Sequence, residues 1–448
     1  MAARRPILLN AFDMNTVGHI AHGLWRHPRD RSTGYKRLPY WLDLARTLER
    51  GLFDGLFLAD VTGVYDVWGG NADAAVRDAI QLPINDPAVL VSAMASVTRH
   101  LGFGITATIS AESPHAFARR MSTLDHLSDG RIGWNVVTGF LDSAARAQGG
   151  TATAGHDQRY DRADEFMALV YQLWHDSWDD DAVLADRARG IYADPAKVRS
   201  IHHEGPFYRL DAVHASEPSP QRTPLLFQAG ASARGTAFAA RHAEVVFVPN
   251  QGLRATAESV RRLRAAIAEH GRAPDSVRFV TTLLAVPGRT EAEARDRHDE
   301  YRRHARPEAG LVQFSSAIGV DLSRHGLDDR VSGGSPDAIQ SSVASLSRGP
   351  SPTVRDILAQ MPLGGRHAPV VGTPAQIADE MEAWIDEAGV DGFNLVRTVS
   401  PEGIEQFVDL VVPELQRRGL HKRAYAEGNW RQKVFGPTGH QRPPALAA

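Results

Sequence analysis

The stretch STLDHLSDGRIGWNVVTG, residues 122–139, decides the fold. Its first residues complete an amphipathic helical pattern, and the run SDG at 128–130 has the composition of a turn. Residues 132–137 are apolar and partly β-branched, which predicts a short buried strand. Asn135 and Thr138 then lie at the carboxyl end of that strand, where parallel α/β folds place ligand-binding groups. The stretch therefore predicts an α/β architecture and part of an active-site rim.

The same order of helix and strand recurs along the chain. Strand-like apolar runs cover residues 7–12, 53–60, 103–109, 132–137, 224–230, 245–249, 277–286 and 393–396. Helical patterns separate them, and two of these open with Ser113-Pro114 and Thr373-Pro374, an N-cap residue followed by proline at the first helical position. About eight strand–helix pairs in one series predict a closed (β/α)8 TIM barrel rather than a doubly wound sheet.

Two segments interrupt the alternation, which predicts insertions into a single barrel domain spanning residues 1–420. Residues of about 176–222 are loop-like, with scattered proline and charge. Residues of about 300–370 are rich in Ser, Gly and Pro; we expect them to lie over the barrel mouth, with a disordered linker as the alternative. The basic, proline-containing residues 421–448 are expected to form a C-terminal arm.

Bulk composition excludes several classes of protein. The 448 residues include 50 Lys and Arg against 53 Asp and Glu, so the net charge of −3 provides no basic field for nucleic acid or an anionic membrane. The chain has no cysteine, which excludes disulfides and thiolate metal sites and favours a reducing, cytoplasmic location. No apolar run approaches the roughly 18 residues of a membrane span, and the first residues lack a signal-peptide pattern.

Polar residues follow several of the predicted strands. Asp60 closes the second strand, and Thr106 and Thr108 share one face of the third because side chains alternate along a strand. Together with Asn135 and Thr138 they would meet at one end of the barrel. Each threonine alone is equally consistent with an ordinary strand residue. Their shared position at strand ends is the stronger indication of a ligand site.

The segment AGASARG, residues 229–235, follows a strand and opens a helix. Small residues let the backbone approach an anion closely, and the free N–H groups of a helix amino terminus favour negative charge. Gly230 and Ser232 are therefore candidates for a phosphate site, with a simple N-cap as the alternative. His156 and Tyr160 precede the amino terminus of another predicted helix, which we expect to begin at about residue 161, and the Tyr160 hydroxyl could bind an anion there or serve in capping.

A histidine-rich loop after the first strand contains His19, His22 and His27. No HExxH motif or carboxylate at helical spacing accompanies them, so we do not expect a metal site. His19 and His22 are candidates for substrate handling or proton transfer, with a structural role in the loop as the alternative. The sequence GFGITA at 102–107 matches a dinucleotide fingerprint only superficially, because its glycines begin a strand instead of joining a strand to a helix.

Several motifs are long enough to carry a family resemblance. They are LERGLFDGLFLAD, FARRMSTLDHLSDGRIGWNVVT, RYDRADEF, FQAGAS, GTPAQIADEM and GVDGFNLV. The chain resembles the bacterial-luciferase-like FMN-dependent monooxygenases, and within them the branch of nitrilotriacetate monooxygenase and dibenzothiophene-sulfone monooxygenase. The resemblance extends from residue 10 to about residue 419 and implies a luciferase-like (β/α)8 barrel.

The resemblance also implies a chemistry. Such enzymes take FMNH2 from a separate NAD(P)H:flavin reductase and use O2 to oxygenate a small organosulfur or amine substrate, in some cases with C–S or C–N cleavage; homodimers or homotetramers are common. The cofactor-binding residues carried over by motif are Asp60, Thr106, Thr108, Thr138, His156, Tyr160, Gly230 and Ser232. Of these, Tyr160 and Ser232 would lie nearest the phosphate. The catalytic candidates are His22, His19 and Asn135.

Two positions depart from the family pattern. Many relatives have serine where Gly139 follows VVT, which removes one hydroxyl from the expected rim. Some have histidine where Ala317 stands in SSAIG, so His19 or His22 becomes the better acid–base candidate. Two other functions stay open: a deazaflavin-dependent oxidoreductase or flavin-degrading enzyme on the same barrel, and a non-enzymatic flavin binder.

Overall fold

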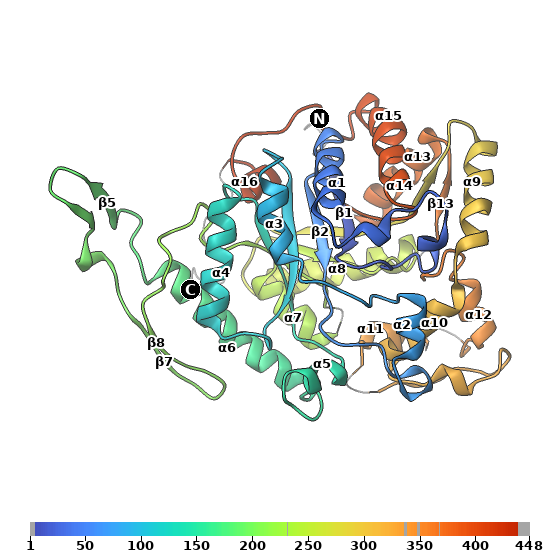
Figure 1. Ribbon diagram of the computed structural model, residues 1–448, viewed down its shortest axis with the longest axis horizontal. Coiled ribbons are helices and arrows are strands. Elements are labelled where there is room, and N and C mark those ends of the chain that lie inside the picture. Colours follow the sequence, from blue (N-terminus) through green and yellow to red (C-terminus); the bar gives the residue numbers. More distant parts are fainter. Residues whose placement is uncertain (1–4, 231, 336–337, 347–349, 367, 438–448) are drawn as a thin grey trace.

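Eight parallel strands close into a barrel at the centre of the molecule (Figure 1). The computed structural model describes residues 5–230, 232–335, 338–346, 350–366 and 368–437. The barrel strands are β1 (Leu8–Met14), β2 (Gly55–Ala59), β3 (Gly102–Thr108), β4 (Ile132–Val137), β9 (Leu225–Gln228), β10 (Val245–Phe247), β11 (Arg278–Leu283) and β14 (Gly392–Val396). Their order around the barrel is β1-β14-β11-β10-β9-β4-β3-β2, so the first strand pairs with the last. The predicted (β/α)8 barrel is confirmed.

The barrel strands are buried on both faces, which explains their nearly continuous apolar sequences. One set of side chains fills the barrel interior, where Phe57, Phe227 and Val280 belong to one cluster. The other set faces the surrounding helices, and Phe103 and Trp134 contribute there to the main apolar core. The strand ends are therefore held by two cores, and they provide a rigid frame for polar side chains at the barrel mouth.

Helices cover the outside of the barrel. They are α1 (Leu38–Arg50), α3 (Ala88–Ala95), α4 (Pro114–Leu127), α6 (His156–His175), α7 (Ala233–His242), α8 (Leu253–Glu269), α13 (Pro374–Ala388), α14 (Glu402–Gln406), a π-helical turn (Phe407–Val411) and α15 (Val412–Arg417). The predicted helix, turn and strand at 122–139 form as expected: Ser113 caps α4, Asp129 and Gly130 have positive φ angles of 52° and 74°, and β4 follows. In the described part of the chain, no helix combines the length and apolarity needed to cross a membrane.

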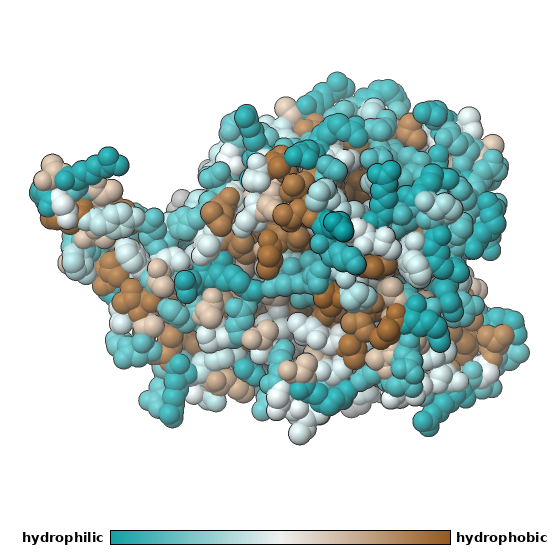
Figure 2. Space-filling model, in the orientation of Figure 1, coloured by the Kyte–Doolittle hydropathy of each residue, from teal (hydrophilic) through white to brown (hydrophobic). Residues whose placement is uncertain are grey.

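The first insertion contains two antiparallel β-hairpins, where we expected only loops. β5 (Val183–Asp186) pairs with β6 (Ile191–Ala193), and β7 (Ile201–Glu204) pairs with β8 (Arg209–Ala212). The β5–β6 hairpin projects away from the barrel (Figure 1), and its Tyr192 is 62% exposed. Figure 2 shows apolar residues on this projection, while much of the viewed face is hydrophilic. The hairpin was not predictable because its strands lack a buried face and so carry no alternating pattern.

The second insertion is largely helical in its described part. After α9 (Glu291–His304) come α10 (Pro307–Ile318), α11 (Gln340–Ser345) and α12 (Val354–Ala359). Leu311, Phe314 and Ile357 belong to an apolar cluster that joins these helices. α10 also packs against α2 (Asp73–Asp78) and against α11. The Arg306 N–H donates to the His22 carbonyl at 2.9 Å, which ties the insertion to the loop after β1 at the barrel mouth.

Residues 430–435 of the expected C-terminal arm pack against the barrel. The helix of this arm, α16 (Trp430–Phe435), closes the amino-terminal end of the barrel, and Trp430 is 2% exposed. A Cβ atom on Gly102 would come within 2.3 Å of the indole, so this glycine leaves the space that the ring fills. Next to it, the buried Arg431 guanidinium forms an ion pair with Glu244 at 2.6 Å. The rest of the expected arm, 438–448, lies outside the described residues.

Candidate active site

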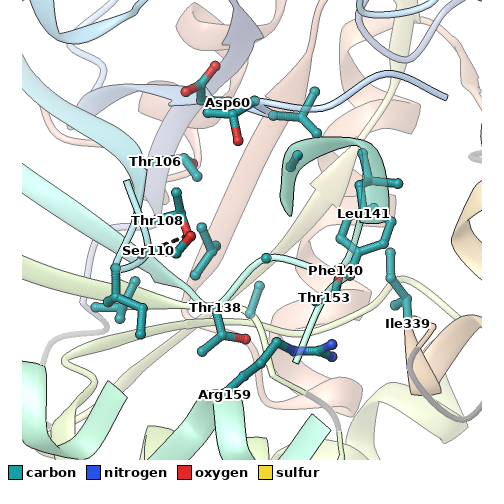
Figure 3. A pocket seen from close by; sticks show the side chains of 18 of the residues that line it. Asp60, Thr106, Thr108, Ser110, Thr138, Phe140, Leu141, Thr153, Arg159 and Ile339 are labelled. Atoms are coloured by element: carbon teal, nitrogen blue, oxygen red, sulfur yellow. Dashed lines mark hydrogen bonds between the residues drawn. The ribbon is translucent and has the colours of Figure 1, made fainter. Parts of the chain in front are cut away.

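A cavity of about 840 Å3 opens at the carboxyl ends of the barrel strands. Its wall combines strand ends, α5 (Asp142–Ala147), the first turns of α6, the start of α7, and residues 313 and 338–340 of the second insertion. The volume lies within the range of small-ligand pockets, roughly 300–1,000 Å3. Figure 3 shows Asp60 and Arg159 on opposite sides of this space, with Thr138 near Arg159.

Most of the predicted site residues line this cavity. They are His19, Asp60, Thr106, Thr108, Thr138, His156, Tyr160, Gly230 and Ser232. Two others, His22 and Asn135, are buried behind the wall and do not line it. The barrel therefore brings together residues that are far apart in the sequence. Their contacts with a cofactor stay a prediction.

One end of the cavity has the features of an anion-binding site. Ser232 lies in the turn between β9 and α7, and its Oγ accepts from the Gly235 N–H at 3.0 Å as the N-cap of α7. Tyr160, in the first turns of α6, makes a hydrogen bond with the Ser232 side chain. A Cβ atom on Gly235 would come within 2.7 Å of the Tyr160 hydroxyl, so the glycine lets the amino termini of α6 and α7 approach each other. Both termini direct N–H groups and positive partial charge to this end.

Arg159 adds a positive charge that sequence reasoning missed. Its side chain lines the cavity (Figure 3), and the residue is only 6% exposed. The guanidinium donates to the Ala154 carbonyl at 3.0 Å, which holds it against the segment before α6. A buried guanidinium beside two helix amino termini favours a phosphate group. In the sequence it begins the motif RYDRADEF, next to Tyr160. It was not assigned to the site because an arginine at a helix start is normally exposed.

Polar side chains form another part of the wall. The buried Asn135 amide donates to Thr106 Oγ1 at 3.0 Å. Asn135 thus orients Thr106 from behind the wall, and this position corrects the expectation that it faces the ligand. Thr108 Oγ1 lies 3.0 Å from Ser110 Oγ. Hydroxyl groups donate and accept, so these strand ends suit a ligand with several hydroxyl or carbonyl groups.

Asp60 has a carboxyl group that titrates near neutral pH. Burial in the cavity wall and the negative charge of Asp86 raise its pKa from 3.8 to about 7, despite a hydrogen bond from the Val61 backbone and the charge of Arg120. A group with this pKa exchanges its proton under physiological conditions. Asp60 can therefore hold or release a proton inside the cavity.

The histidines of the loop after β1 have three different environments. His19 lines the cavity and packs edge-on against Phe12, with ring centroids 4.5 Å apart. His22 is fully buried, which lowers its pKa to about 4. Its imidazole is therefore neutral at physiological pH and is a poor general acid. His27 lies 3.2 Å from Glu300 on α9, away from the cavity lining. Across the described ranges, no group of His, Asp and Glu is arranged to hold a metal ion.

The two departures from the family pattern occupy different environments. Gly139 lines the cavity and has a φ angle of +76°, a left-handed conformation that glycine adopts without strain. Gly139 therefore allows the backbone after β4 to turn in this conformation, and it also lacks the hydroxyl that a serine would add. Ala317 packs against the apolar cluster of α10–α12 and does not line the cavity. Gln313, one helical turn earlier on α10, does line it, and no motif marked this residue in the sequence.

A parallel barrel whose mouth has the features of an anion-binding site is typical of enzymes that bind phosphate-bearing ligands. Residues 21–392 match the model of the luciferase-like monooxygenase family, and the chain belongs to that family. It is 43% identical over 436 residues to the dimethyl-sulfide monooxygenase of Hyphomicrobium sulfonivorans, covering 97% of this chain and 91% of the relative. It is 44% identical over 439 residues to the long-chain alkane monooxygenase of Geobacillus thermodenitrificans, covering 98% and 96%.

Members of the predicted branch match as well, which confirms the resemblance. Identity is 38% to the dibenzothiophene-sulfone monooxygenase of Rhodococcus erythropolis, covering 95% of each chain, and 33% to component A of the nitrilotriacetate monooxygenase of Aminobacter aminovorans, covering 91% of this chain and 92% of the relative. A crystal structure of a riboflavin lyase with modified FMN and riboflavin superimposes with a TM-score of 0.92 at 35% identity, covering 99% of both chains. The protein is therefore an oxidoreductase of a flavin-dependent family.

Proposed function

We propose that the protein is an FMNH2-dependent monooxygenase of a two-component system. It receives FMNH2 from a separate NAD(P)H:flavin reductase, uses O2 and oxygenates a small organosulfur or amine substrate. The observation that carries this proposal is the anion-binding end of the cavity, where Tyr160, Ser232 and Arg159 converge at the mouth of a luciferase-like barrel. This end matches the phosphate of FMN in charge and in hydrogen-bond donors.

The cavity residues fit FMN. Tyr160, Ser232 and Arg159 would hold the phosphate, and the threonines at the ends of β3 and β4 would face the more polar parts of the ribityl chain and the ring. When bound, reduced FMN supplies the electrons that activate O2. The chain itself binds and orients the cofactor and the substrate, excludes water and handles protons.

Apolar residues next to α5 and α11 help to exclude water. Phe140, Leu141 and Ile339 line the cavity, and Figure 3 shows them on one side of it. A dry site suits this chemistry because water favours the wasteful release of hydrogen peroxide. Asp60 can hold a proton at its carboxyl near neutral pH, and His19 presents an imidazole to the same cavity.

Reconstitution tests the proposed activity. The protein is mixed with FMN, NADH and a generic flavin reductase, and oxygen uptake and hydrogen peroxide are followed while thioethers, sulfones and amines are screened. A monooxygenase gives substrate-dependent oxygen uptake with less peroxide. Breakdown of the flavin without any such substrate would support a flavin-degrading enzyme instead, a function favoured by the likeness to the riboflavin lyase structure. Flavin binding with no reaction of oxygen would support a flavin binder.

Arg159→Gln tests the phosphate site. We expect its affinity for FMN to fall about ten-fold to a hundred-fold, because hydrogen bonds to a charged group contribute about 1.5–3 kcal/mol. The affinity for riboflavin, which lacks the phosphate, should not change. Quenching of flavin fluorescence measures both, with Arg254→Gln on α8 as the control, since that side chain is 94% exposed. Equal losses for FMN and riboflavin would rule out a phosphate contact.

A further inference from the structure

Four uncharged side chains are linked by hydrogen bonds between the loop after β1, the loops around α2, and α10. They are His22, Gln313, Tyr65 and Gln81, and the last three line the cavity. Gln313 comes from the second insertion, far along the sequence from the other three, and reaches them because α10 packs against α2.

His22 fixes the orientation of the Gln313 amide. His22 Nε2 lies 2.9 Å from Gln313 Oε1. An amide oxygen only accepts hydrogen bonds, so Nε2 carries the proton and donates it. Burial lowers the pKa of His22 to about 4, although the bond to Gln313 and the charge of Asp78 act in the opposite direction. The imidazole is therefore neutral at physiological pH, and the amide nitrogen of Gln313 is left to face other partners.

Tyr65 and Gln81 extend this set of hydrogen bonds beyond Gln313. The Tyr65 hydroxyl donates to Gln81 Oε1 at 2.6 Å and makes a further hydrogen bond with the Gln313 side chain. Burial raises the pKa of Tyr65 to about 12, so the hydroxyl keeps its proton. Gln81 Nε2 donates to the His19 carbonyl at 2.9 Å, and the Gln81 backbone has a φ angle of +51°. Residues with side chains rarely adopt this conformation, and such strain concentrates at functional sites.

The surroundings combine amide donors with apolar walls. The side-chain amides of Gln313 and Gln81 each have two N–H bonds. One N–H of each makes the hydrogen bond described above, and the second is left for a ligand. Phe12, Ile20 and Ile339 line the same cavity with apolar surface. The arginines of the described lining belong to α6: Arg159 lies at the anion-binding end, and Arg162 donates to the Tyr208 hydroxyl at 2.8 Å.

We infer that Gln313 donates a hydrogen bond to the substrate, that His22 is its positioning residue, and that this part of the cavity selects an uncharged substrate with an apolar body and a polar group that accepts hydrogen bonds. The inference rests on the proposed monooxygenase function and narrows its substrate class. Sulfoxides and sulfones meet the description. Polycarboxylates do not, because the four linked side chains offer a carboxylate no positive charge and burial of an unpaired charge is unfavourable.

Calorimetric binding tests the inference apart from turnover, with and without oxidised FMN. The probes are sulfolane, a neutral ring with acceptor oxygens; cyclopentane, a ring without an acceptor; and nitrilotriacetate, a polycarboxylate. We expect sulfolane to bind at least ten-fold more tightly than nitrilotriacetate. Gln313→Leu should weaken sulfolane binding about five-fold to ten-fold, the ratio for one neutral hydrogen bond, and leave cyclopentane binding unchanged. Gln172→Leu on α6, outside the cavity lining, is the matched control and should change neither.

Two variants test the positioning role of His22. His22→Leu removes the donor to Gln313 and should reproduce the loss of sulfolane affinity, whereas His22→Gln supplies a replacement N–H and should restore most of it. A purely structural role would give similar affinities in the two variants once their folding is matched by Tm. Nitrilotriacetate binding as tight as that of sulfolane, or an unchanged sulfolane-to-cyclopentane ratio in Gln313→Leu, would overturn the inference. These binding results are separate from the proposed function, which falls if FMNH2 and O2 produce no oxygenation.

Discussion

The carboxyl group of Asp60 lies in the cavity wall, an environment that disfavours its charged form. The cavity wall removes water from the carboxyl group and Asp86 contributes a like charge, so the pKa rises to about 7. Between the usual value of 3.8 and this raised pKa, the folded protein binds a proton that the unfolded chain releases. The stability from this proton is fully present below pH 3.8 and is lost as the pH rises through about 7. The same carboxyl is the titrating group that a reaction in the cavity could use at neutral pH.

Asp60→Asn removes the charge and keeps the shape of the side chain. We expect the variant to have a higher Tm than the wild type above pH 7, because the wild type then holds a buried carboxylate. The difference should shrink as the pH falls towards 4. Differential scanning fluorimetry at several pH values measures it, with Asp296→Asn at an exposed position of α9 as the control. A Tm difference that does not depend on pH would contradict the raised pKa.

At the scale of elements, α16 closes the barrel chiefly with one large buried side chain, Trp430. Trp430 occupies space next to Gly55, Gly102 and Gly133, at the amino-terminal ends of β2, β3 and β4. Its partners lie some 300 residues earlier in the chain, so no local pattern marks it. We therefore expect this short helix to contribute more to stability than its length suggests.

Trp430→Ala should lower the free energy of unfolding by about 3–5 kcal/mol, because it removes a large buried side chain and leaves a cavity. Urea unfolding measures the loss. Tyr192→Ala at the exposed hairpin is the control and should stay within about 0.5 kcal/mol of the wild type. Flavin affinity of the folded variant should not change, since the ligand cavity lies at the other end of the barrel. A loss below about 1 kcal/mol would mean that the indole is not the main closure.

The elements that were predictable from sequence are those with local causes. The α4–turn–β4 unit has a capping Ser113, helical periodicity and turn residues within one short stretch, so its pattern and its structure agree. Strand ends can also be located from sequence, and Asp60, Thr106 and Thr108 at those ends line the cavity. The hairpins at 183–212 could not be predicted, because exposed strands lack the apolar face that would mark them in the sequence.

The parts of the site that were missed depend on tertiary packing. Arg159 is buried and donates to the Ala154 carbonyl in the segment before α6, whereas its sequence context is that of an exposed helical arginine. Gln313 reaches the cavity only because α10 packs against the barrel mouth, and it separates His22 from the ligand space. Periodicity and motifs report neighbours along the chain, so neither residue could be assigned before the fold was known.

At the scale of the whole molecule, buried histidines in three regions couple folding to pH. His22 lies in the loop after β1, His214 in the first insertion and His421 in the C-terminal segment, and burial lowers the pKa of each from 6.5 to about 4. Because each folded-state pKa is lower than the unfolded value, unfolding takes up protons between these limits. The stability that these neutral histidines contribute is fully present above pH 6.5 and is lost as the pH falls towards 4.

His214→Gln isolates one of these contributions. His214 Nε2 lies 3.0 Å from Ser122 Oγ, and glutamine can keep a hydrogen bond to that hydroxyl without titrating. A shift in pKa from 6.5 to about 4 corresponds to about 2 kcal/mol of lost stability at pH 5. Urea unfolding at pH 7.5 and pH 5 should therefore show that the variant loses about 2 kcal/mol less than the wild type between the two conditions, whatever the carboxyl groups add. His202→Gln on the exposed β7–β8 hairpin should lose as much as the wild type, since its side chain is 70% exposed. Equal losses in His214→Gln and the wild type would show that this buried imidazole does not couple folding to pH.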